Sequence, residues 1–527
     1  MTQPRVLVAD KLSPRAADIF AERGIEAVVQ TGLTPDQLKE TIADFDGLAV
    51  RSATKVTADI LEHAPRLKVV GRAGIGVDNI DVPAATAKGV VVMNTPFGNS
   101  VTTAEHAVAM MLSLARQIPA ADRSTRAGKW EKSRFMGVEV TGKVLGIIGT
   151  GNIGSIVASR ALGLRMRVIA YDPFLSPERA EDLGIDKVDL DQLLARSDFV
   201  TIHTPLNDHT RNLIDAKALA GAKKGIRIIN CARGGIVDEA ALADALRSGQ
   251  VAGAALDVFV EEPAREHPLF DFEEVVVTPH VGASTGEAQE NVALQVAEQM
   301  ADYLTTGAVV NALNMASVSA EEAPKLRPYM QLCTQLGSFA GQLTRTGLTG
   351  AHVTFAGDAA ELNTRPLVAS ILEALLRPMT DSVNMVNAPL VARERDIDVQ
   401  VTTRERVDGY TTLVTLAVDT ENGTRTVSGT LVQDGAARIV GIRGIRMDAE
   451  LGPRMLFVRN NDAPGLIGKL GTILGDARLN IANFHLGREK AGGEAIALLE
   501  VDQDVPAAVV RDIQAIPQVI QVQPMRF

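Results

Sequence analysis

The stretch Lys143–Gly154, with the sequence KVLGIIGTGNIG, constrains the fold of this chain more than any other feature. An apolar strand pattern leads directly into three glycines, and a helical pattern follows them. Glycines at this spacing let the backbone turn sharply and approach a pyrophosphate, which then sits at the N-terminus of the helix. The sequence therefore predicts a dinucleotide site. The candidate cofactor contacts in this turn are Gly149, Gly151, Asn152, Ile153 and Gly154.

A carboxylate at the end of the next predicted strand narrows the choice of cofactor. The strand Met166–Tyr171 ends in Asp172, which lies 18 residues beyond Gly154. A carboxylate at this place bonds the ribose diol and repels a phosphate at the 2′ position. We therefore expect NAD rather than NADP. The alternative is a glycine-rich turn that binds no ligand.

Length and composition limit the classes of protein to which the chain belongs. A chain of 527 residues is too long for one core and predicts three or four domains. The net charge of −11 argues against nucleic acid and anionic membranes as general partners. Cys231 and Cys333 have neither metal-ligand nor disulfide spacing, so we expect no metal site. Without a signal-peptide pattern or an apolar run of membrane length, we expect a cytoplasmic protein.

Short apolar strands alternate with amphipathic helices through residues 1–313, which is typical of two doubly wound, parallel-sheet (Rossmann-like) α/β units. Residues 309–314 look like a segment that returns to the first unit, so we expect that unit to be discontinuous, with a ligand cleft beside the second. A predicted linker at 315–327 leads to an α+β unit with hairpin turns at 421–423 and 433–435. The last unit reads βαββαβ, the ferredoxin-like order. The expected boundaries are 1–97 with 283–313, then 98–282, 316–452 and 453–527.

Three polar side chains follow successive strands of the second unit, where doubly wound sheets bind their ligands. They are Arg233, Glu262 and His280. Oxidation of an alcohol with NAD needs a base for the hydroxyl proton, and histidine suits this task near neutral pH. A carboxylate orients the imidazole and favours its protonated form, and a guanidinium binds a substrate carboxylate. Each residue alone is more often structural, but the three together predict a dehydrogenase site.

In these motifs the chain resembles the D-isomer-specific 2-hydroxyacid dehydrogenases over residues 1–313. The resemblance implies that residues 98–282 bind NAD and that the discontinuous unit binds the substrate. It assigns catalysis to Arg233, Glu262 and His280. It also implies cofactor contacts at Ile75, Thr204, Cys231, Ala232, Asp257 and Gly282.

Within that family, the segments 51–54 (RSAT), 71–81 (GRAGIGVDNID) and 130–137 resemble the D-3-phosphoglycerate dehydrogenases. The resemblance implies oxidation of 3-phosphoglycerate to 3-phosphohydroxypyruvate, the first step of serine biosynthesis. By this resemblance Arg51 and Arg72 bind the phosphate. The alternative is that both are solvated arginines at the ends of loops. The candidate substrate contacts are Arg51, Ser52, Arg72, Gly74, Ile75, Asn99 and Arg134. By the same resemblance Arg134 reaches the site of a neighbouring subunit, and Trp130 lies at that interface or else in an ordinary core.

The last unit resembles an ACT domain, a small ligand-sensing module of amino-acid metabolism. The resemblance implies L-serine as the effector, with contacts at Asn460, Asp462 and Asn480, and a homo-oligomer, which we expect to be a tetramer. The alternative is a purely structural oligomerisation domain. Residues 316–452 resemble the intervening domain of the longer family members. Its three arginines are either an anion pocket or a charged strand edge; they are Arg438, Arg443 and Arg446.

Two other functions stay open at this point. The chain is alternatively another D-2-hydroxyacid dehydrogenase, such as a hydroxypyruvate or glyoxylate reductase, or a non-catalytic amino-acid-sensing protein. His106 and His203 are rival bases, but we expect His106 to pack within a helix and His203 to line the cofactor face. We expect Cys231 to be a small packing residue rather than a redox group.

Overall fold

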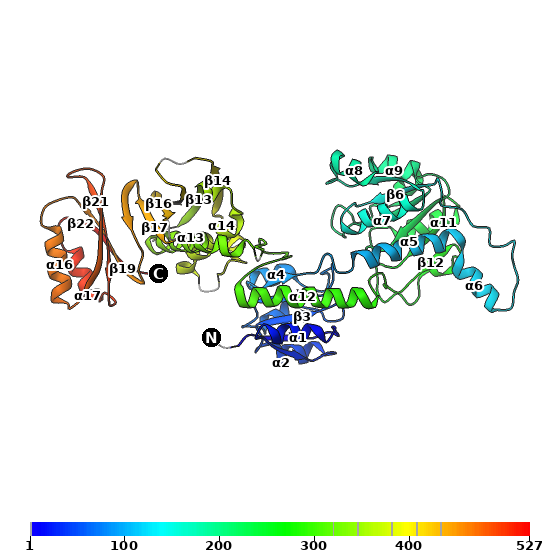
Figure 1. Cartoon of the computed structure of the whole chain (residues 1–527), viewed down its shortest axis with the longest axis horizontal. Coiled ribbons are helices and arrows are strands. Elements are labelled where there is room, and N and C mark those ends of the chain that lie inside the picture. The colour runs from blue at the N-terminus through cyan, green and yellow to red at the C-terminus, as the bar shows by residue number, and fades with distance from the viewer. Residues whose placement is uncertain (1–2, 320, 345–346, 381–382, 407–408, 433–434) are drawn as a thin grey trace.

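The computed structural model describes residues 3–319, 321–344, 347–380, 383–406, 409–432 and 435–527. It contains four sheets, of five, seven, six and four strands in chain order. In Figure 1 the first sheet lies at lower centre, the second at upper right, the third left of centre and the fourth at far left. The first two sheets are wholly parallel, the third is mixed and the fourth is antiparallel. The predicted fold class is confirmed.

The first sheet has the strand order β2-β1-β3-β4-β5. Helix α12 (Gly286–Thr306) returns the chain to this sheet and packs Val296 and Met300 against it. Gly71 in β4 permits this close approach, because a Cβ there would lie 2.1 Å from the Sδ of Met300. The other elements of this unit are β1 (Arg5–Val8), α1 (Arg15–Glu22), β2 (Glu26–Val29), α2 (Pro35–Ile42), β3 (Gly47–Val50), α3 (Ala58–Glu62), β4 (Val69–Arg72), α4 (Val82–Ala87) and β5 (Val91–Met93).

The segment that follows α12 lies along the edge of the first sheet. Met93 of β5 forms an antiparallel bridge with Ala312. The N–H of Leu313 donates to the carbonyl of Val92 at 2.9 Å. These contacts tie residues 309–314 to the first sheet, while the exact domain boundaries stay a prediction.

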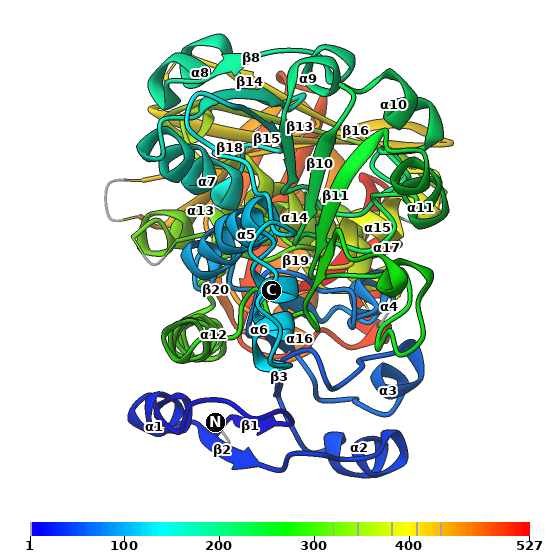
Figure 2. The same cartoon turned by 90° about the vertical axis from the view of Figure 1, so that its right-hand side faces the viewer.

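The second sheet has the order β12-β11-β10-β9-β6-β7-β8, which is doubly wound about β6 and β9. Helix α5 ends at Arg116, and the left-handed conformation of Gln117 separates it from α6. Viewed from its side, this unit stands above the first (Figure 2). Its helices are α5 (Ser100–Arg116), α6 (Ile118–Arg126), α7 (Asn152–Gly163), α8 (Pro177–Leu183), α9 (Leu190–Arg196), α10 (Ala216–Gly221), α11 (Glu239–Arg247) and the 3-10 turn η1 (Pro268–Asp271). Its strands are β6 (Val144–Ile148), β7 (Arg167–Tyr171), β8 (Asp186–Lys187), β9 (Phe199–Ile202), β10 (Ile226–Asn230), β11 (Val251–Leu256) and β12 (Val275–Val277).

The third sheet has the order β14-β13-β15-β16-β17-β18, and the sequence reading missed β13, β14 and β18. The predicted linker at 315–327 is wrong in its second half, because α13 begins at Ala323 and tolerates a proline in its first turn. The turn predicted at 421–423 is confirmed between β15 and β16, whereas residues 433–434 of the other turn lie outside the described residues. The strands are β13 (Leu348–Gly357), β14 (Asp398–Arg404), β15 (Thr412–Thr420), β16 (Gly423–Leu431), β17 (Ala437–Ile442) and β18 (Ile445–Ala449). The helices are α13 (Ala323–Leu343), α14 (Thr364–Leu376) and α15 (Ala388–Glu394), with 3-10 turns η2 (Asp358–Ala360) and η3 (Arg377–Met379).

The fourth sheet has helices on one face and the third unit on the other. Its strand order β20-β21-β19-β22 and its element order match the predicted βαββαβ pattern. Phe339 of α13 packs edge-on against Phe457 of β19 with ring centroids 5.9 Å apart. The third and fourth units therefore share one hydrophobic core. The elements are β19 (Arg454–Asn461), α16 (Leu466–Asp476), β20 (Ile481–Arg488), β21 (Glu494–Val501), α17 (Ala507–Gln514) and β22 (Val519–Arg526).

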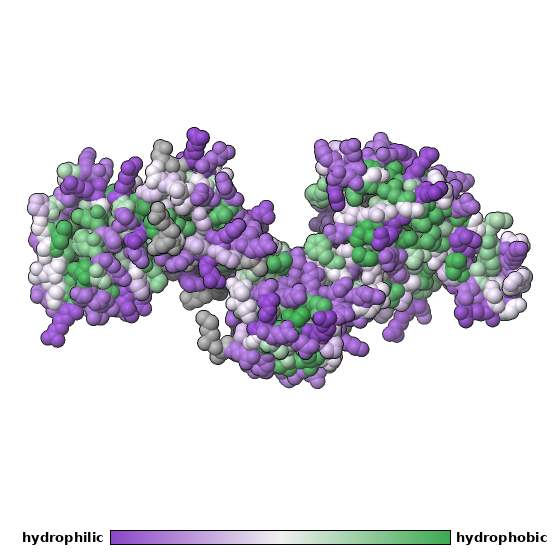
Figure 3. All heavy atoms as spheres, viewed as in Figure 1, coloured by the Kyte–Doolittle hydropathy of each residue, from purple (hydrophilic) through white to green (hydrophobic). Residues whose placement is uncertain are grey.

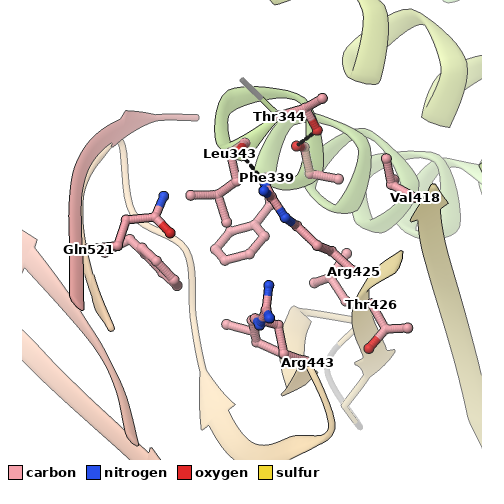
Figure 4. A pocket seen from close by; sticks show the side chains of 12 residues that line it. Phe339, Leu343, Thr344, Val418, Arg425, Thr426, Arg443 and Gln521 are labelled. Carbon is pink, nitrogen blue, oxygen red and sulfur yellow. Dashed lines mark hydrogen bonds between the residues drawn. The ribbon is translucent and has the colours of Figure 1, made fainter. Parts of the chain in front are cut away.

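A small cavity of about 30 Å³ remains in the seam between these two units (Figure 4). Arg425 and Arg443 point toward it, and Arg425 also donates to the carbonyl of Leu343 at 2.6 Å. That volume holds a water molecule or two and excludes an amino acid. Of the other predicted arginines, Arg438 pairs with Glu450 at 3.3 Å instead, and Arg446 is exposed. The three arginines therefore do not line one common cavity.

Polar side chains cover most of the face shown in Figure 3, and apolar side chains are visible mainly in the middle of each unit. Among the described residues, no helix has the length and apolar character needed to cross a membrane.

Candidate active site

The glycine-rich turn lies between β6 and α7, as the sequence predicts. Gly149 follows β6 with a φ of 90°, and a Cβ on Gly154 would lie 1.9 Å from the carbonyl oxygen of Gly149. Gly151 precedes α7 without a side-chain cap and faces open space. Asn152 and Ile153 form the first turn of this 12-residue helix. Its free N–H groups and positive dipole end are therefore available to a pyrophosphate, so the residues present fit a dinucleotide.

Asp172 lies directly after β7 and beside the glycine-rich turn. Its Oδ2 accepts hydrogen bonds from the N–H of Thr150 at 2.8 Å and from the hydroxyl of Thr150 at 3.0 Å. Thr204 lies against the same turn, since its backbone nitrogen is 3.3 Å from the place of a Cβ on Gly149. The carboxylate is thus held at the place where a ribose diol binds in doubly wound domains.

Three loops that follow β10, β11 and β12 touch one another. The Nδ1 of His280 lies 2.6 Å from Oε2 of Glu262, and the other oxygen of Glu262 accepts the N–H of Phe259 at 3.0 Å. Gly234 packs so closely on this loop that a Cβ would lie 1.9 Å from the carbonyl oxygen of Phe259. Arg233 adjoins Gly234, so the structure brings the loops of all three predicted catalytic residues together. Because Nδ1 faces the carboxylate, Nε2 is the nitrogen left for a substrate.

The buried side chain of Asp257 fixes the loop that carries His280. Its two oxygens accept the N–H groups of Val281 and Gly282, each at 2.8 Å, and its own carbonyl accepts the N–H of His280. Burial by itself would raise the pKa of Asp257. Hydrogen bonds from His106, from the hydroxyl of Thr278 and from these two amides have the larger combined effect and lower it. This anchor holds His280 in a left-handed conformation with a φ of 53°. A direct contact of Asp257 or Gly282 with the cofactor stays a prediction.

Arg233 crosses from the second unit to the first. Its Nε donates to Oδ2 of Asp78 at 3.0 Å, and its Nη1 donates to the carbonyl of Ala232 at 2.7 Å. Gly76 makes room for it, because a Cβ there would lie 1.7 Å from Nη2 of Arg233. The guanidinium therefore lies between the loop after β4 and the loop after β10.

Arg72, at the end of β4, is a largely buried cation close to Arg233. Its Nε is buried and, within the described residues, has no hydrogen-bond partner. Burial and the positive charge of Arg233 lower the pKa of Arg72 to about 10, and Arg51 adds to the effect. Gly74 leaves space for the guanidinium, since a Cβ would lie 1.5 Å from Nη1 of Arg72. Its Nη1 donates only a long hydrogen bond, to the carbonyl of Ala73 at 3.4 Å. A largely buried cation with an unsatisfied N–H is costly unless an anion binds it.

The remaining predicted substrate residues lie around this cluster or apart from it. Ser52 follows β3 with Arg51, whose Nη1 donates to the carbonyl of Lys11 at 3.3 Å. Asn99 precedes α5 with a buried Oδ1 that has no partner among the described residues. The carbonyl of Ile75 accepts the Nδ2 of Asn94 at 2.6 Å.

Arg134 lies outside the cluster, on the surface of the second unit. It pairs with Glu131 at 3.1 Å and with Glu273 at 2.5 Å. Trp130 nearby is 86% exposed, so the core alternative for it is wrong in this chain. The expected role of Arg134 in a neighbouring subunit stays a prediction.

Comparison with known proteins identifies the family of this chain. Over 97% of its length the chain is 43% identical to a D-3-phosphoglycerate dehydrogenase of Synechocystis, and the match covers 93% of that protein. A D-3-phosphoglycerate dehydrogenase of Bacillus subtilis is 40% identical over 98% of this chain and 99% of its own. The chain belongs to the D-3-phosphoglycerate dehydrogenase family.

Three family models match successive parts of this member of the phosphoglycerate dehydrogenase family. Residues 108–282 match the NAD-binding domain of the D-isomer-specific 2-hydroxyacid dehydrogenases, 325–443 match the D-3-phosphoglycerate dehydrogenase intervening domain, and 454–518 match the ACT domain. Among solved structures, a glyoxylate reductase from Paecilomyes thermophila is 30% identical, with a TM-score of 0.56, and covers 59% of this chain and 99% of its own. The TT0316 protein from Thermus thermophilus is 34% identical, with a TM-score of 0.54, at the same coverage. The chain is thus an NAD-dependent oxidoreductase, as predicted.

The two other candidate bases, His203 and His106, and the thiol of Cys231 differ from His280 in their surroundings. His203 is partly buried, with its Nδ1 enclosed, and desolvation lowers its pKa to about 4, so it is neutral at pH 7. His106 contacts the buried Asp257 at 3.4 Å, which makes it part of the anchor for His280. Burial raises the pKa of the Cys231 thiol, as expected of a packing residue. Among the described residues, no three His, Cys, Asp or Glu side chains group as metal ligands do.

The predicted effector residues of the ACT domain are spread over three local networks. Asn460 is 1% exposed, and its Oδ1 is buried without a partner among the described residues. Asp462 binds Arg488 at 3.2 Å, and Asn480 binds Asp502 at 2.9 Å. Their joint role as an effector site stays a prediction.

Two residues of the active site escaped the reading of the sequence. Asp78 binds Arg233 from the first unit, and Asn230 binds both sides of the Arg233 loop, by accepting the N–H of Ala232 and donating to the carbonyl of Arg233. Asp78 lies in the motif at 71–81 and Asn230 ends a predicted strand, so the sequence marked both positions as candidates for the site.

Proposed function

We propose that this chain oxidises D-3-phosphoglycerate to 3-phosphohydroxypyruvate with NAD, as the first step of L-serine biosynthesis. One observation carries the choice of substrate. Arg72 presents a largely buried guanidinium whose Nε has no partner among the described residues, and Arg51 and Arg233 add positive charge beside it. A substrate with a phosphate at one end and a carboxylate at the other supplies the two anions that such a cluster needs.

The proton and the substrate are handled by residues with distinct roles. His280 accepts the hydroxyl proton on Nε2, and Glu262 stabilises the resulting imidazolium through Nδ1. Arg233 binds the carboxylate and polarises the neighbouring oxygen. Arg51 and Arg72 bind the phosphate, with Ser52, Gly74, Ile75 and Asn99 completing the substrate contacts.

Bound NAD would supply the acceptor for the hydride of the carbinol carbon. The turn at 149–154 and the N-terminus of α7 would hold its pyrophosphate, and Asp172 would hold the adenosine ribose. The further contacts proposed for the cofactor are Ile75, Thr204, Cys231, Ala232, Asp257 and Gly282. Ala232, Asp257 and Gly282 lie in or next to the loops after β10, β11 and β12 that carry Arg233, Glu262 and His280.

Steady-state formation of reduced cofactor tests this proposal. We expect turnover with D-3-phosphoglycerate and NAD, and a much lower kcat/KM with D-glycerate, which lacks the phosphate, or with NADP. Equal kcat/KM for the two acids would favour a hydroxypyruvate or glyoxylate reductase instead. No turnover with any hydroxy acid, together with binding of labelled serine in equilibrium dialysis, would favour an amino-acid-sensing protein.

The ACT domain suggests an amino-acid effector, and we propose L-serine, bound near Asn460, Asp462 and Asn480. We also propose a cytoplasmic homo-oligomer, specifically a tetramer, in which Arg134 reaches the site of a neighbouring subunit. Addition of serine to the assay and sedimentation analysis of the purified chain test these two points separately.

A further inference from the structure

The edge strand of the third sheet is open. Among the described residues, β14 pairs with β13 alone, through a parallel ladder from Asp398 to Arg404. The N–H and C=O groups that point away from β13 thus form an unpaired row along this strand. The opposite edge of the same sheet is different, because β18 lies against the ACT domain, where a Cβ on Gly487 would lie 2.6 Å from the carbonyl oxygen of Arg446.

This edge lacks the devices with which proteins protect exposed strands. The five central residues, Val399–Thr403, have the sequence VQVTT, which contains no charge, proline or glycine and favours β structure. Val401 in the middle is 45% exposed. Other edge strands are short or protected: β8 has two residues and β2 has four, β20 contacts β18, and β22 contains a proline. Such an edge needs a partner strand.

The two faces of β14 differ. Val399 and Val401 point to the same side and line a groove of about 1160 Å³, in which they lie beside apolar residues such as Leu313 and Pro389 and polar ones such as Arg365 and Arg393. The alternate residues, Asp398 and Arg404 at the ends with two uncharged polar residues between them, point to the other side. A partner strand must therefore be apolar on one face and polar on the other.

The strand is complementary to itself. When two copies of β14 run antiparallel about an axis through Val401, all seven residues pair. Asp398 then faces Arg404 of the other copy at both ends, and Val401 faces its own copy over the groove. A shift of the register by one residue in either direction places Val401 opposite a polar residue, Gln400 or Thr402, and in one direction it also places Asp398 opposite Glu405, where like charges repel. Side-chain face and charge therefore favour this register over both one-residue shifts.

We propose that β14 pairs with β14 of a second copy of this chain, so that the third sheets of two subunits join into one continuous sheet. The inference does not depend on the reaction that the chain catalyses. It adds a specific interface to the expected oligomer.

Disulfide cross-linking of the full-length chain tests the pairing. Val401→Cys places two thiols opposite each other, and mild oxidation should give a covalent dimer that reductant reverses. The native Cys231 and Cys333 are buried, so the unsubstituted chain should stay uncrosslinked. Val29→Cys is a matched control, because Val29 is an exposed valine, 59% accessible, on the edge strand of another sheet. Thr402→Cys checks the register, because its side chain points to the other face, opposite position 400.

A charge swap separates this interface from chance collisions. In the Val401→Cys chain, Arg404→Asp places two carboxylates opposite each other at both ends of the strand pair, and the yield of dimer should fall by about tenfold. Adding Asp398→Arg restores both pairs and should restore the yield. Circular dichroism reports whether each variant is folded.

The proposal is overturned if folded Val401→Cys gives no more dimer than Val29→Cys, which would indicate another partner or none. It is also overturned if the double charge swap fails to recover the dimer.

Discussion

Replacement of Glu262 with glutamine tests how the chain stabilises a protonated His280. The substitution keeps the shape of the side chain and an oxygen that accepts the N–H of Phe259, now at 3.0 Å. It removes the negative charge whose Oε2 lies 2.6 Å from Nδ1 of His280. The loop should therefore keep its conformation, and only the electrostatic support of the imidazolium should be lost.

The expected loss follows from the geometry. Two unit charges about 4 Å apart interact by about 4 kcal/mol at an effective dielectric constant of about 20. The side chains are 50% and 35% exposed, so water weakens the interaction, and we take about half of that value. A loss of about 2 kcal/mol in the transition state lowers kcat by about 30-fold.

The assay is steady-state formation of reduced cofactor from D-3-phosphoglycerate at saturating NAD. Glu262 touches His280 rather than the proposed anion sites, so KM should change little. Glu261→Gln is the matched control, because this exposed neighbour carries the same charge, and it should retain the wild-type kcat. A kcat of Glu262→Gln within twofold of wild type would refute the stated role of the carboxylate.

Three further substitutions probe other parts of the molecule. Arg72→Met should raise KM for D-3-phosphoglycerate by about 100-fold while leaving D-glycerate turnover unchanged, because a charged hydrogen bond to phosphate contributes roughly 1.5–3 kcal/mol; an equal effect on both acids would contradict the phosphate role. His203→Gln tests acid stability. Burial holds the folded pKa of His203 at about 4, below the ordinary 6.5, so the unfolded chain binds the proton first and wild-type stability falls as pH drops through this window. Between pH 6.5 and about 4, the free energy of unfolding from urea titrations should fall by up to about 3 kcal/mol less in the variant than in wild type. An equal fall in both proteins would contradict the assignment. Phe339→Ala removes a buried ring shared by the intervening and ACT domains, so it should cost about 3–5 kcal/mol and lower the unfolding temperature of both together in calorimetry; separate transitions with only one shifted would show that the two do not share a core.

The parts of the fold that the sequence predicted correctly are those with local signals. The glycines at 149, 151 and 154 dictate a sharp turn before a helix, and Asp172 marks the end of the next strand, so the dinucleotide site follows from short-range rules. The βαββαβ order of the last unit also follows from hydrophobic alternation within single elements.

The parts that the sequence did not reveal depend on long-range contacts. Strand β14 is exposed along nearly its whole length and has only two alternating apolar residues, Val399 and Val401, which is too short a pattern to identify a strand; it forms because β13 pairs with it. In the active site, the contact between Asp78 and Arg233 joins residues 155 positions apart. No local pattern could have shown it. The contact between Glu262 and His280 was expected, because both follow strands of one parallel sheet.

A crystal structure of this chain with NAD and D-3-phosphoglycerate tests the central claim most directly. We predict the phosphate within hydrogen-bond distance of the Nε of Arg72, the carboxylate on Arg233, and the substrate hydroxyl on Nε2 of His280. A phosphate bound away from Arg72, or a hydroxyl that does not contact His280, would contradict the account.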